Sequence, residues 1–449
     1  MIILLRVGIR LCLRSSSLFE DLSRDFKSTS MKICCFFLLC SSAFSLFSQG
    51  RFNFDEAKVP PYTLPELLVG ADGSKVQTKE GWVSRRAEIL ALFEEHVYGE
   101  VPEEAQKVKL TAEKGLVIPD FMNGKATLKE VSLEGEGIEL SLLLVIPNEA
   151  SKPAPAILGL NFGGNHTVHV DPRISLTQSW VYGNKKDPLE SHQATEKRRG
   201  ANASRWPLEM IVDQGFAFAT IYCGDIDPDF DDGFRNGVHA VFGKPEPHEW
   251  GTIAAWSWGL SRGLDYLIEE PEIAGDQVGV FGFSRLGKAA VWAGASDTRF
   301  AFVISNESGC GGTALSRRAF GETVKRINTS FPHWFGDNFV KYNGEEASLP
   351  VDQHQLIALV APRPIYIGSA VDDRWADPRG EFLAGKFAEP AYELFGKAGF
   401  GVDELPAVDS PVGKTMRYHI RSGAHGVKEY DWVQYLKFAK EEVVRDSKD

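Results

Sequence analysis

A short segment, Gly282–Lys288, constrains the fold and the chemistry of this chain more than any other. Its sequence is Gly-Phe-Ser-Arg-Leu-Gly-Lys; it follows the apolar run Val278–Phe281 and precedes the helix-compatible run Lys288–Ala295. The glycines allow a sharp turn without Cβ clashes. A buried strand, a tight turn with a serine at its tip and then a helix expose that serine as a nucleophile. The segment therefore predicts a nucleophilic Ser284 at a strand–helix turn.

Two cations distinguish this turn. Arg285 is adjacent to the serine, and Lys288 lies one helical turn beyond Ser284 on the same helix face. A substrate with several oxygens, or a developing oxyanion, would give both cations a partner. The spacing departs from the usual G-x-S-x-G because the second glycine comes one place late. The alternative is an ordinary glycine-rich turn in which Ser284 only caps the helix.

Short apolar runs alternate with helical stretches over most of the chain. This pattern predicts an α/β fold, a three-layer sandwich with a mostly parallel central sheet and helices on both faces. With the serine turn it indicates the α/β-hydrolase fold. The predicted strands are Ala126–Leu133, Ile138–Ile146, Ala156–Phe162, Phe216–Tyr222, Gln277–Phe283, Phe300–Ile304, Pro364–Gly368 and Met416–Ile420, and the predicted helices include Trp82–Tyr98, Trp250–Ile268 and Tyr430–Val444.

Polar residues follow the carboxyl ends of four predicted strands. In chain order they are Ser284, Glu307, Asp373 and, within a glycine-rich turn, His425. Such ends meet at one edge of a parallel sheet, and nucleophile, acid, histidine is the α/β-hydrolase order. We expect His425 to activate the serine and a carboxylate to orient the imidazole. His166, which follows an earlier strand, is the alternative base.

Composition excludes several classes of partner. The 449 residues carry a net charge of −12, and the pI near 5.4 argues against a nucleic-acid partner, which needs a basic face. The proportions of 43% hydrophobic and 24% charged residues are typical of a soluble globular protein. The glycine-rich runs lack the spacing of nucleotide-binding loops, and the cysteines lack that of a metal site. We expect neither a cofactor nor a metal.

The N-terminal sequence predicts export. From Met31 onward, one basic residue, an apolar core and a small-residue exit describe a secretory signal peptide. We expect residues 1–30 to be an upstream artefact, and 31–49 to be removed by cleavage near Ser48-Gln49. A membrane anchor, or a lipoprotein linked through Cys40, is the alternative. No membrane span is expected in the mature chain.

The rest of the chain shows no clear internal boundary. We expect residues 50–449 to form a single catalytic domain whose first part, about 50–125, wraps around it. A polar insertion, Thr167–Arg205, follows one of the core strands and is positioned to overhang the site. Cys223 and Cys310 remain in the mature chain, and their spacing does not decide between a disulfide and buried thiols.

Six motifs between Gly282 and Gly426 carry a family resemblance, which spans roughly Ala154 to the C-terminus. They are Gly282–Lys288, Asn306–Gly312, Asp352–His354, Ala361–Pro364, Asp373–Pro378 and Gly423–Gly426. Together they resemble the glucuronoyl esterases, carbohydrate esterase family 15, in the bacterial branch of that family. The resemblance implies hydrolysis of the ester between the carboxyl group of (4-O-methyl)glucuronic acid on glucuronoxylan and a lignin alcohol.

The resemblance also implies roles for individual residues. Ser284 and His425 match the catalytic pair, with an acyl-enzyme on the serine. Family members place the acid at the position of Glu307 or at that of Asp373, and this chain has both. We expect Glu307 to be the main partner of His425 and Asp373 to support it. Arg285 matches the arginine that assists the oxyanion hole.

Three further residues match positions that hold the sugar, namely Lys288, Glu322 and Trp375. Fungal members join two cysteines, one before the nucleophile and one after the histidine, where this chain has Phe283 and Gly426. Another carbohydrate esterase, such as an acetyl-xylan esterase, is the main alternative, and a non-catalytic carbohydrate-binding protein is an alternative of a different class. We expect a monomer.

Overall fold

The computed structural model describes residues 52–183 and 192–443. The predicted upstream stretch (1–30) and signal peptide (31–49) lie outside the described residues. Residues Phe54–Asp449 cluster as one compact unit. None of the helices in the described ranges is long and apolar enough to cross a bilayer.

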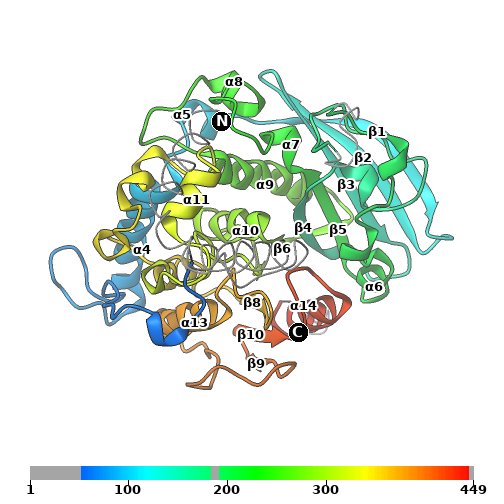
Figure 1. Cartoon of the computed structure of the whole chain (residues 1–449). Coiled ribbons are helices and arrows are strands. Elements are labelled where there is room, and N and C mark those ends of the chain that lie inside the picture. The colour runs from blue at the N-terminus through cyan, green and yellow to red at the C-terminus, as the bar shows by residue number, and fades with distance from the viewer. Residues whose placement is uncertain (1–51, 184–191, 444–449) are drawn as a thin grey trace, which may run out of the picture. The chain divides into compact units, whose positions relative to one another are not determined.

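A ten-stranded sheet in the order β1-β2-β3-β5-β4-β6-β7-β8-β10-β9 forms the centre of this unit. From β5 to β10 along this order, neighbouring strands are parallel, and the remaining pairs are antiparallel (Figure 1). The strands are β1 (Thr111–Phe121), β2 (Ala126–Gly135), β3 (Ile138–Pro147), β4 (Ala154–Asn161), β5 (Ala217–Tyr222), β6 (Ile273–Phe283), β7 (Val303–Asn306), β8 (Ile365–Ala370), β9 (Val412–Gly413) and β10 (Met416–Arg421).

Helices cover both faces of the sheet, which confirms the predicted three-layer α/β architecture. Helices α9 and α10 lie on one face, and α6 and α14 on the other (Figure 1). The α-helices are α4 (Lys79–Phe93), α5 (Glu103–Lys107), α6 (Leu208–Asp213), α7 (Cys223–Ile226), α8 (Gly237–Phe242), α9 (Thr252–Glu269), α10 (Arg285–Ser296), α11 (Val324–Ser330), α12 (Gln353–Ala358), α13 (Pro378–Glu393) and α14 (Glu429–Glu442).

Several predictions about strands were wrong in detail, among them the start of β6, which lies at Ile273 rather than Gln277. Strand β1 falls in the segment expected only to wrap around the domain, and it pairs with β2 at the edge of the sheet. Its Gly115 and Pro119 hid it, because these residues weaken a strand pattern yet are tolerated at an edge. The strand expected at Phe300–Ile304 begins later, at Val303.

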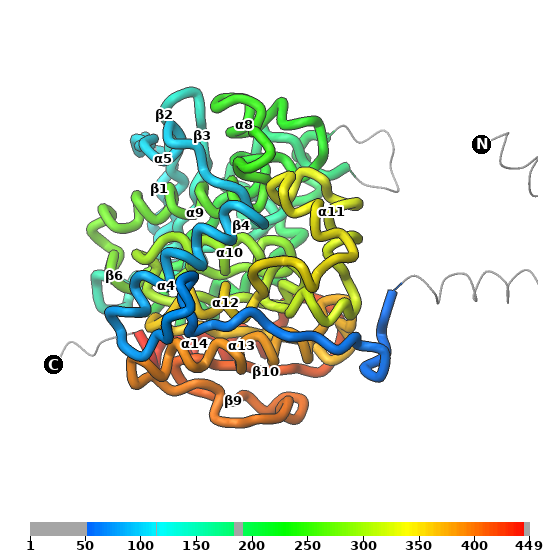
Figure 2. The backbone as a smooth tube through the Cα atoms, turned by 90° about the vertical axis from the view of Figure 1, so that its left-hand side faces the viewer, coloured from blue at the N-terminus to red at the C-terminus, as the bar shows by residue number. Residues whose placement is uncertain are grey.

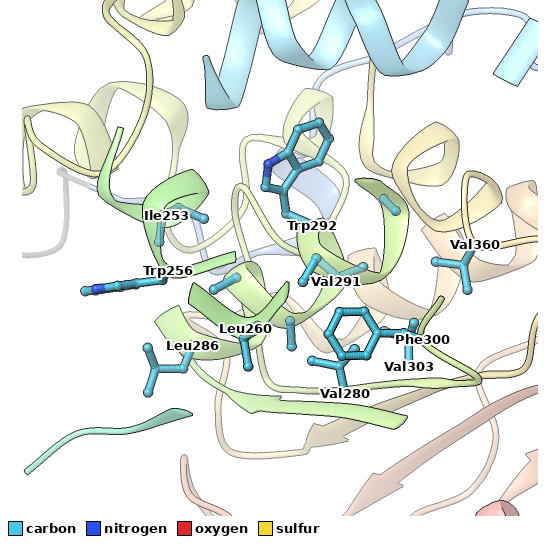
Figure 3. Packing of buried hydrophobic residues seen from close by; sticks show 14 of the residues in the cluster. Ile253, Trp256, Leu260, Val280, Leu286, Val291, Trp292, Phe300, Val303 and Val360 are labelled. Carbon is cyan, nitrogen blue, oxygen red and sulfur yellow. The ribbon is translucent and has the colours of Figure 1, made fainter. Parts of the chain in front are cut away.

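Two apolar clusters, one on each face of the sheet, make up the core. In β3, Leu142 and Leu144 belong to one cluster, while Leu143 and Val145 belong to the other, as the two-residue period of a strand requires. On the first face α9 and α10 bury helical stripes against β6 and β7. Figure 3 shows this packing with Ile253, Trp256, Leu260, Val280, Leu286, Val291, Trp292, Phe300, Val303 and Val360 labelled.

The first part of the segment that precedes β1, from Phe54 to α4, lies beside α12 and α13, as the blue tube in Figure 2 shows. Arg86 of α4 donates hydrogen bonds to the carbonyl oxygens of Leu359 and Ala295. Nearer the N-terminus, Glu56 pairs with Arg318 at 2.6 Å. These contacts bind the N-terminal segment to the same side of the sheet as α10.

Candidate active site

Ser284 occupies a strained turn between β6 and α10. Its φ is 57° and its ψ is −129°, a conformation that costs a non-glycine residue about 1–3 kcal/mol. Its N–H donates to the Asn306 carbonyl at 2.9 Å, and its own carbonyl accepts from Gly287 at 2.8 Å. A Cβ at Gly282 would collide with the carbonyl oxygen of Leu286. The turn therefore requires the glycine and presents the serine hydroxyl at the carboxyl edge of the sheet.

His425 connects this serine to two carboxylates. It lies in the loop after β10, and its Nε2 is 3.1 Å from the Ser284 Oγ. Its Nδ1 lies 2.6 Å from Asp373 Oδ2 and 2.9 Å from Glu307 Oε2. A serine, an imidazole and an acid in this order can relay a proton from the hydroxyl to the ring.

The two acids have different partners. Glu307 is buried and accepts hydrogen bonds from the Arg421 guanidinium and, at 2.8 Å, from the Gly426 N–H. Arg421 also pairs with buried Asp431 at 2.9 Å. Asp373, in the turn after β8, has the shorter contact with the imidazole. Burial raises the pKa of Glu307 above its usual value, against the opposing effects of His425 and Arg421.

The electrostatic environment favours the charged form of His425. Burial alone would lower its pKa, but the hydrogen bonds and charges of Asp373 and Glu307 outweigh burial and raise the pKa to about 9. The ring also packs on Phe283, with centroids 4.7 Å apart. The imidazolium that forms during proton transfer is thus well stabilised.

The two cations differ in the donors they have left. Lys288 donates to the carbonyl oxygens of Ser308 and Cys310, both at 2.6 Å, and lies 3.6 Å from Glu322. An ammonium has three donors, so one remains on the side of Glu322. Arg285 binds the Asp229 carboxylate through Nη1. Its Nε has no hydrogen-bond partner among the described residues.

One pocket of about 330 Å³ brings together every site residue predicted from the sequence. Its lining includes the eight predicted residues Ser284, Arg285, Lys288, Glu307, Glu322, Asp373, Trp375 and His425, and also Ser308, Gly309, Phe331, Trp334 and Ala376. The alternative base, His166, is fully buried elsewhere, and burial lowers its pKa to about 4. Phe331 and Trp334 were missed because they follow α11, away from the strand ends.

Three of these residues could also serve as ligands of a metal ion. Glu307, Asp373 and His425 offer atoms that lie within 4.8 Å of one another. The three residues already contact one another, because His425 Nδ1 lies 2.6 Å from Asp373 and 2.9 Å from Glu307. The Arg421 guanidinium beside Glu307 also adds a positive charge that opposes a metal ion. The cluster is better suited to holding an imidazolium.

The remaining sequence predictions concern cysteines and rigidity. Cys223 and Cys310 are free, buried thiols. At the positions of the fungal cysteines, the Phe283 ring packs against His425, and the Gly426 N–H binds Glu307. Noncovalent contacts therefore hold the histidine loop beside the nucleophile turn.

The fold and this site define the class of protein: an α/β-hydrolase with the arrangement of a serine hydrolase. A family profile for fungal glucuronyl esterases matches residues 208–396. A glucuronoyl esterase from Solibacter usitatus, 47% identical, superimposes with a TM-score of 0.81 over 86% of this chain and 99% of its own. The chain belongs to the glucuronoyl esterases, carbohydrate esterase family 15, and is a carboxylic ester hydrolase.

Two other relatives show how far the similarity extends. A promiscuous esterase of carbohydrate esterase family 15 from a marine bacterial metagenome is 48% identical, with a TM-score of 0.81 over 87% of this chain and all of its own. A 4-O-methyl-glucuronoyl methylesterase from Schizophyllum commune is 28% identical over 374 residues, which are 80% of this chain and 81% of that protein. The similarity thus covers nearly the whole described unit.

Proposed function

We propose that this protein hydrolyses esters between the carboxyl group of (4-O-methyl)glucuronic acid on glucuronoxylan and lignin alcohols. The observation that carries the proposal is the contact of Ser284 with His425 at 3.1 Å, inside a pocket that also holds Arg285 and Lys288. Membership of the glucuronoyl esterases supplies the substrate class. A sugar acid ester has hydroxyls for a lysine and a carbonyl oxygen for an arginine.

The mechanism begins at Ser284. His425 Nε2 takes the hydroxyl proton while Oγ attacks the ester carbon, and the negative charge gathers on the former carbonyl oxygen. Arg285 and the backbone N–H groups at the start of α10 stabilise this oxyanion. His425 then protonates the departing alcohol, which leaves an acyl-enzyme. In the second half the imidazole activates water, and the uronic acid is released.

We assign the principal acid role to Asp373 and a supporting role to Glu307, the reverse of the order expected from the sequence. Asp373 makes the shorter contact with Nδ1, 2.6 Å against 2.9 Å. Much of the Glu307 charge is neutralised by Arg421. A carboxylate without such a counterion stabilises an imidazolium more.

Three pocket residues are assigned to the sugar. Lys288 and Glu322 lie together on one side of the pocket, where a donor and an acceptor can share the ring hydroxyls. Trp375 offers an indole beside them, and aromatic faces suit the apolar faces of sugars. After hydrolysis the free uronate carries a charge that Arg285 attracts, so glucuronate should inhibit competitively.

The cellular setting is part of the proposal. A cleaved signal peptide at 31–49 would deliver residues 50–449 to the periplasm or the medium, where xylan and lignin fragments occur. We propose that the mature chain acts as a monomer and as one catalytic domain. N-terminal sequencing of the secreted protein and light scattering of the purified chain test these two statements.

Hydrolysis of a benzyl ester of glucuronic acid tests the activity. We expect turnover by the wild type, and a loss of about 10⁴-fold or more in Ser284→Ala. Acetylated xylan is the matched competitor substrate. Faster release of acetate than of benzyl alcohol would favour an acetyl-xylan esterase, and sugar binding without turnover of either ester would indicate a carbohydrate-binding protein.

A further inference from the structure

Residues other than the proposed catalytic ones contact the guanidinium of Arg285 and fix its position. One edge binds the carboxylate of Asp229. Its central carbon lies 4.9 Å from the ring centroid of Trp334 and 5.3 Å from that of Phe331, two rings that stack on each other at 3.7 Å. We propose that Asp229 is a positioning residue, which aims Arg285 at the oxyanion through a buried network with His333 and Trp334.

Asp229 is itself fixed at both of its oxygens. Oδ1 accepts hydrogen bonds from His333 Nε2 at 3.1 Å and from Trp334 Nε1 at 2.8 Å. Oδ2 accepts a hydrogen bond from Arg285 Nη1. Its main-chain oxygen accepts from the Tyr182 hydroxyl. The residue is only 5% exposed. A carboxylate with this many partners cannot swing, so its ion pair defines where the guanidinium lies.

Trp334 contacts both members of the ion pair between Asp229 and Arg285. Its N–H binds the carboxylate, and its ring lies beside the guanidinium that the same carboxylate binds. Cation, anion and ring therefore form one unit, in which moving any member disturbs the other two. Burial of the pair strengthens these interactions relative to water.

The ion pair leaves Arg285 with donors to use. A guanidinium has five N–H groups in a rigid fork. Nη1 binds Asp229, and Nε is itself buried and has no hydrogen-bond partner among the described residues, while the side chain as a whole lines the pocket, where the remaining terminal N–H groups can act. An arginine anchored along one edge presents the remaining donors in a fixed direction. Such preorganisation is what makes an oxyanion site effective.

The anchor also keeps its charge. Burial alone would raise the pKa of Asp229, but the hydrogen bonds from His333 and Trp334 and the charge of Arg285 lower it to about 2. The carboxylate is therefore ionised wherever His425 can act as a base. Its contribution does not vary over the pH range of catalysis.

The test compares Asp229→Asn with Arg285→Ala and with the double variant, on the benzyl ester of glucuronic acid. It rests on the proposed role of Arg285 in the proposed esterase. We expect Asp229→Asn to lower kcat about 30-fold and to change KM less than about threefold, because an oxyanion donor is worth about 10²–10³-fold. In the Arg285→Ala background the same substitution should cost less than about twofold, because coupled residues are not additive.

The matched control is Asp227→Asn in the same loop. Asp227 binds His239 and Thr252 and does not line the pocket, so its loss should lower the melting temperature yet leave kcat within about twofold. If Asp229→Asn fails to fold, Trp334→Phe serves instead. It keeps a ring, removes the N–H that binds Asp229, and should lower kcat about fivefold.

Two outcomes would overturn the proposal. One is a wild-type kcat in Asp229→Asn while Arg285→Ala is slow. The other is an equal cost of Asp229→Asn in both backgrounds. A crystal structure of Asp229→Asn gives a readout that does not depend on activity: the guanidinium should leave its wild-type position. Absence of all esterase activity from the wild type would sink the proposed function, while a displaced guanidinium would still support the anchoring role.

Discussion

Two carboxylates reach the same nitrogen of His425 from the ends of neighbouring strands, and their surroundings differ. Glu307, after β7, is 2% exposed and shares the guanidinium of Arg421 with Asp431. Asp373, after β8, has no cation of this kind in the described part of the chain, and its side-chain hydrogen bond goes to the imidazole. One acid is neutralised by its neighbours and the other is not.

This difference separates two tasks that are usually given to one acid. Glu307 also binds the Gly426 N–H, so it ties down the loop that carries the histidine. Asp373, which contacts Nδ1 without such a counterion among the described residues, is the acid that we propose compensates the imidazolium. We infer that Glu307 contributes mainly to the position of His425 and Asp373 mainly to its basicity. Each substitution below tests this division.

The largest effect is expected when both acids are neutralised. In the double variant Glu307→Gln, Asp373→Asn the imidazole loses both charges at Nδ1, and kcat should fall about 10⁴-fold, as in serine proteases that lose their aspartate. Steady-state hydrolysis of a glucuronate ester measures it. If the double variant is no slower than Asp373→Asn alone, Glu307 has no part in catalysis.

Asp373→Asn alone should lower kcat about 10²–10³-fold, less than the double variant because Glu307 still contacts Nδ1. The matched control is Asp372→Asn, which removes an exposed carboxylate from the same turn and should leave kcat unchanged. A smaller loss in Asp373→Asn than in Glu307→Gln would restore the order of acids expected from the sequence.

Glu307→Gln should lower kcat only about tenfold but should destabilise the fold more than Asp373→Asn does. The reason is Arg421, which is 2% exposed and would keep Asp431 as its only compensating carboxylate among its described contacts. Breaking a buried pair costs about 3 kcal/mol. Urea unfolding measures this, and equal unfolding free energies of the two variants would contradict the division of tasks.

The comparison also shows what local sequence could predict. The serine turn, the order of the strands and the residues at the strand ends follow from hydrophobic period and turn chemistry, and they placed all eight candidates in one pocket. The role of Arg421 could not be predicted, because nothing in the local sequence distinguishes this arginine from the other residues of its strand. Whether an acid is neutralised depends on neighbours more than a hundred residues away, and no local pattern carries that.

Asp229 and Trp334 were missed for the same reason. Each lies in a loop outside the strand-end pattern, and only the fold brings them to Arg285. Strand β1 was missed for a different reason. Its glycine and proline are unfavourable in a central strand and acceptable at the edge, and the sequence did not tell which position the strand takes.

The smallest effect concerns pH. His425, the proposed base, must be neutral to accept the serine proton, and its pKa is raised to about 9. The kcat/KM of the wild type should therefore rise with pH, reach half of its limiting value near pH 9 and level off above it. Removing one carboxylate removes part of what stabilises the imidazolium, so Asp373→Asn should level off at a lower pH, by about one unit.

The same linkage predicts the sign of a stability change. The folded-state pKa of His425 lies above the ordinary value of 6.5, so its pairing with the carboxylates stabilises the fold fully below about pH 6.5, and this contribution is lost as the pH rises through about 9. The difference in melting temperature between wild type and Asp373→Asn should therefore shrink from pH 6 to pH 10. Glu307 remains beside the ring in Asp373→Asn, so the same substitution made in the Glu307→Gln background tests whether the two acids compensate for each other. If they do, adding Asp373→Asn to Glu307→Gln should change the melting temperature more than adding it to the wild type. Equal differences in the two backgrounds would mean that each acid acts on His425 independently.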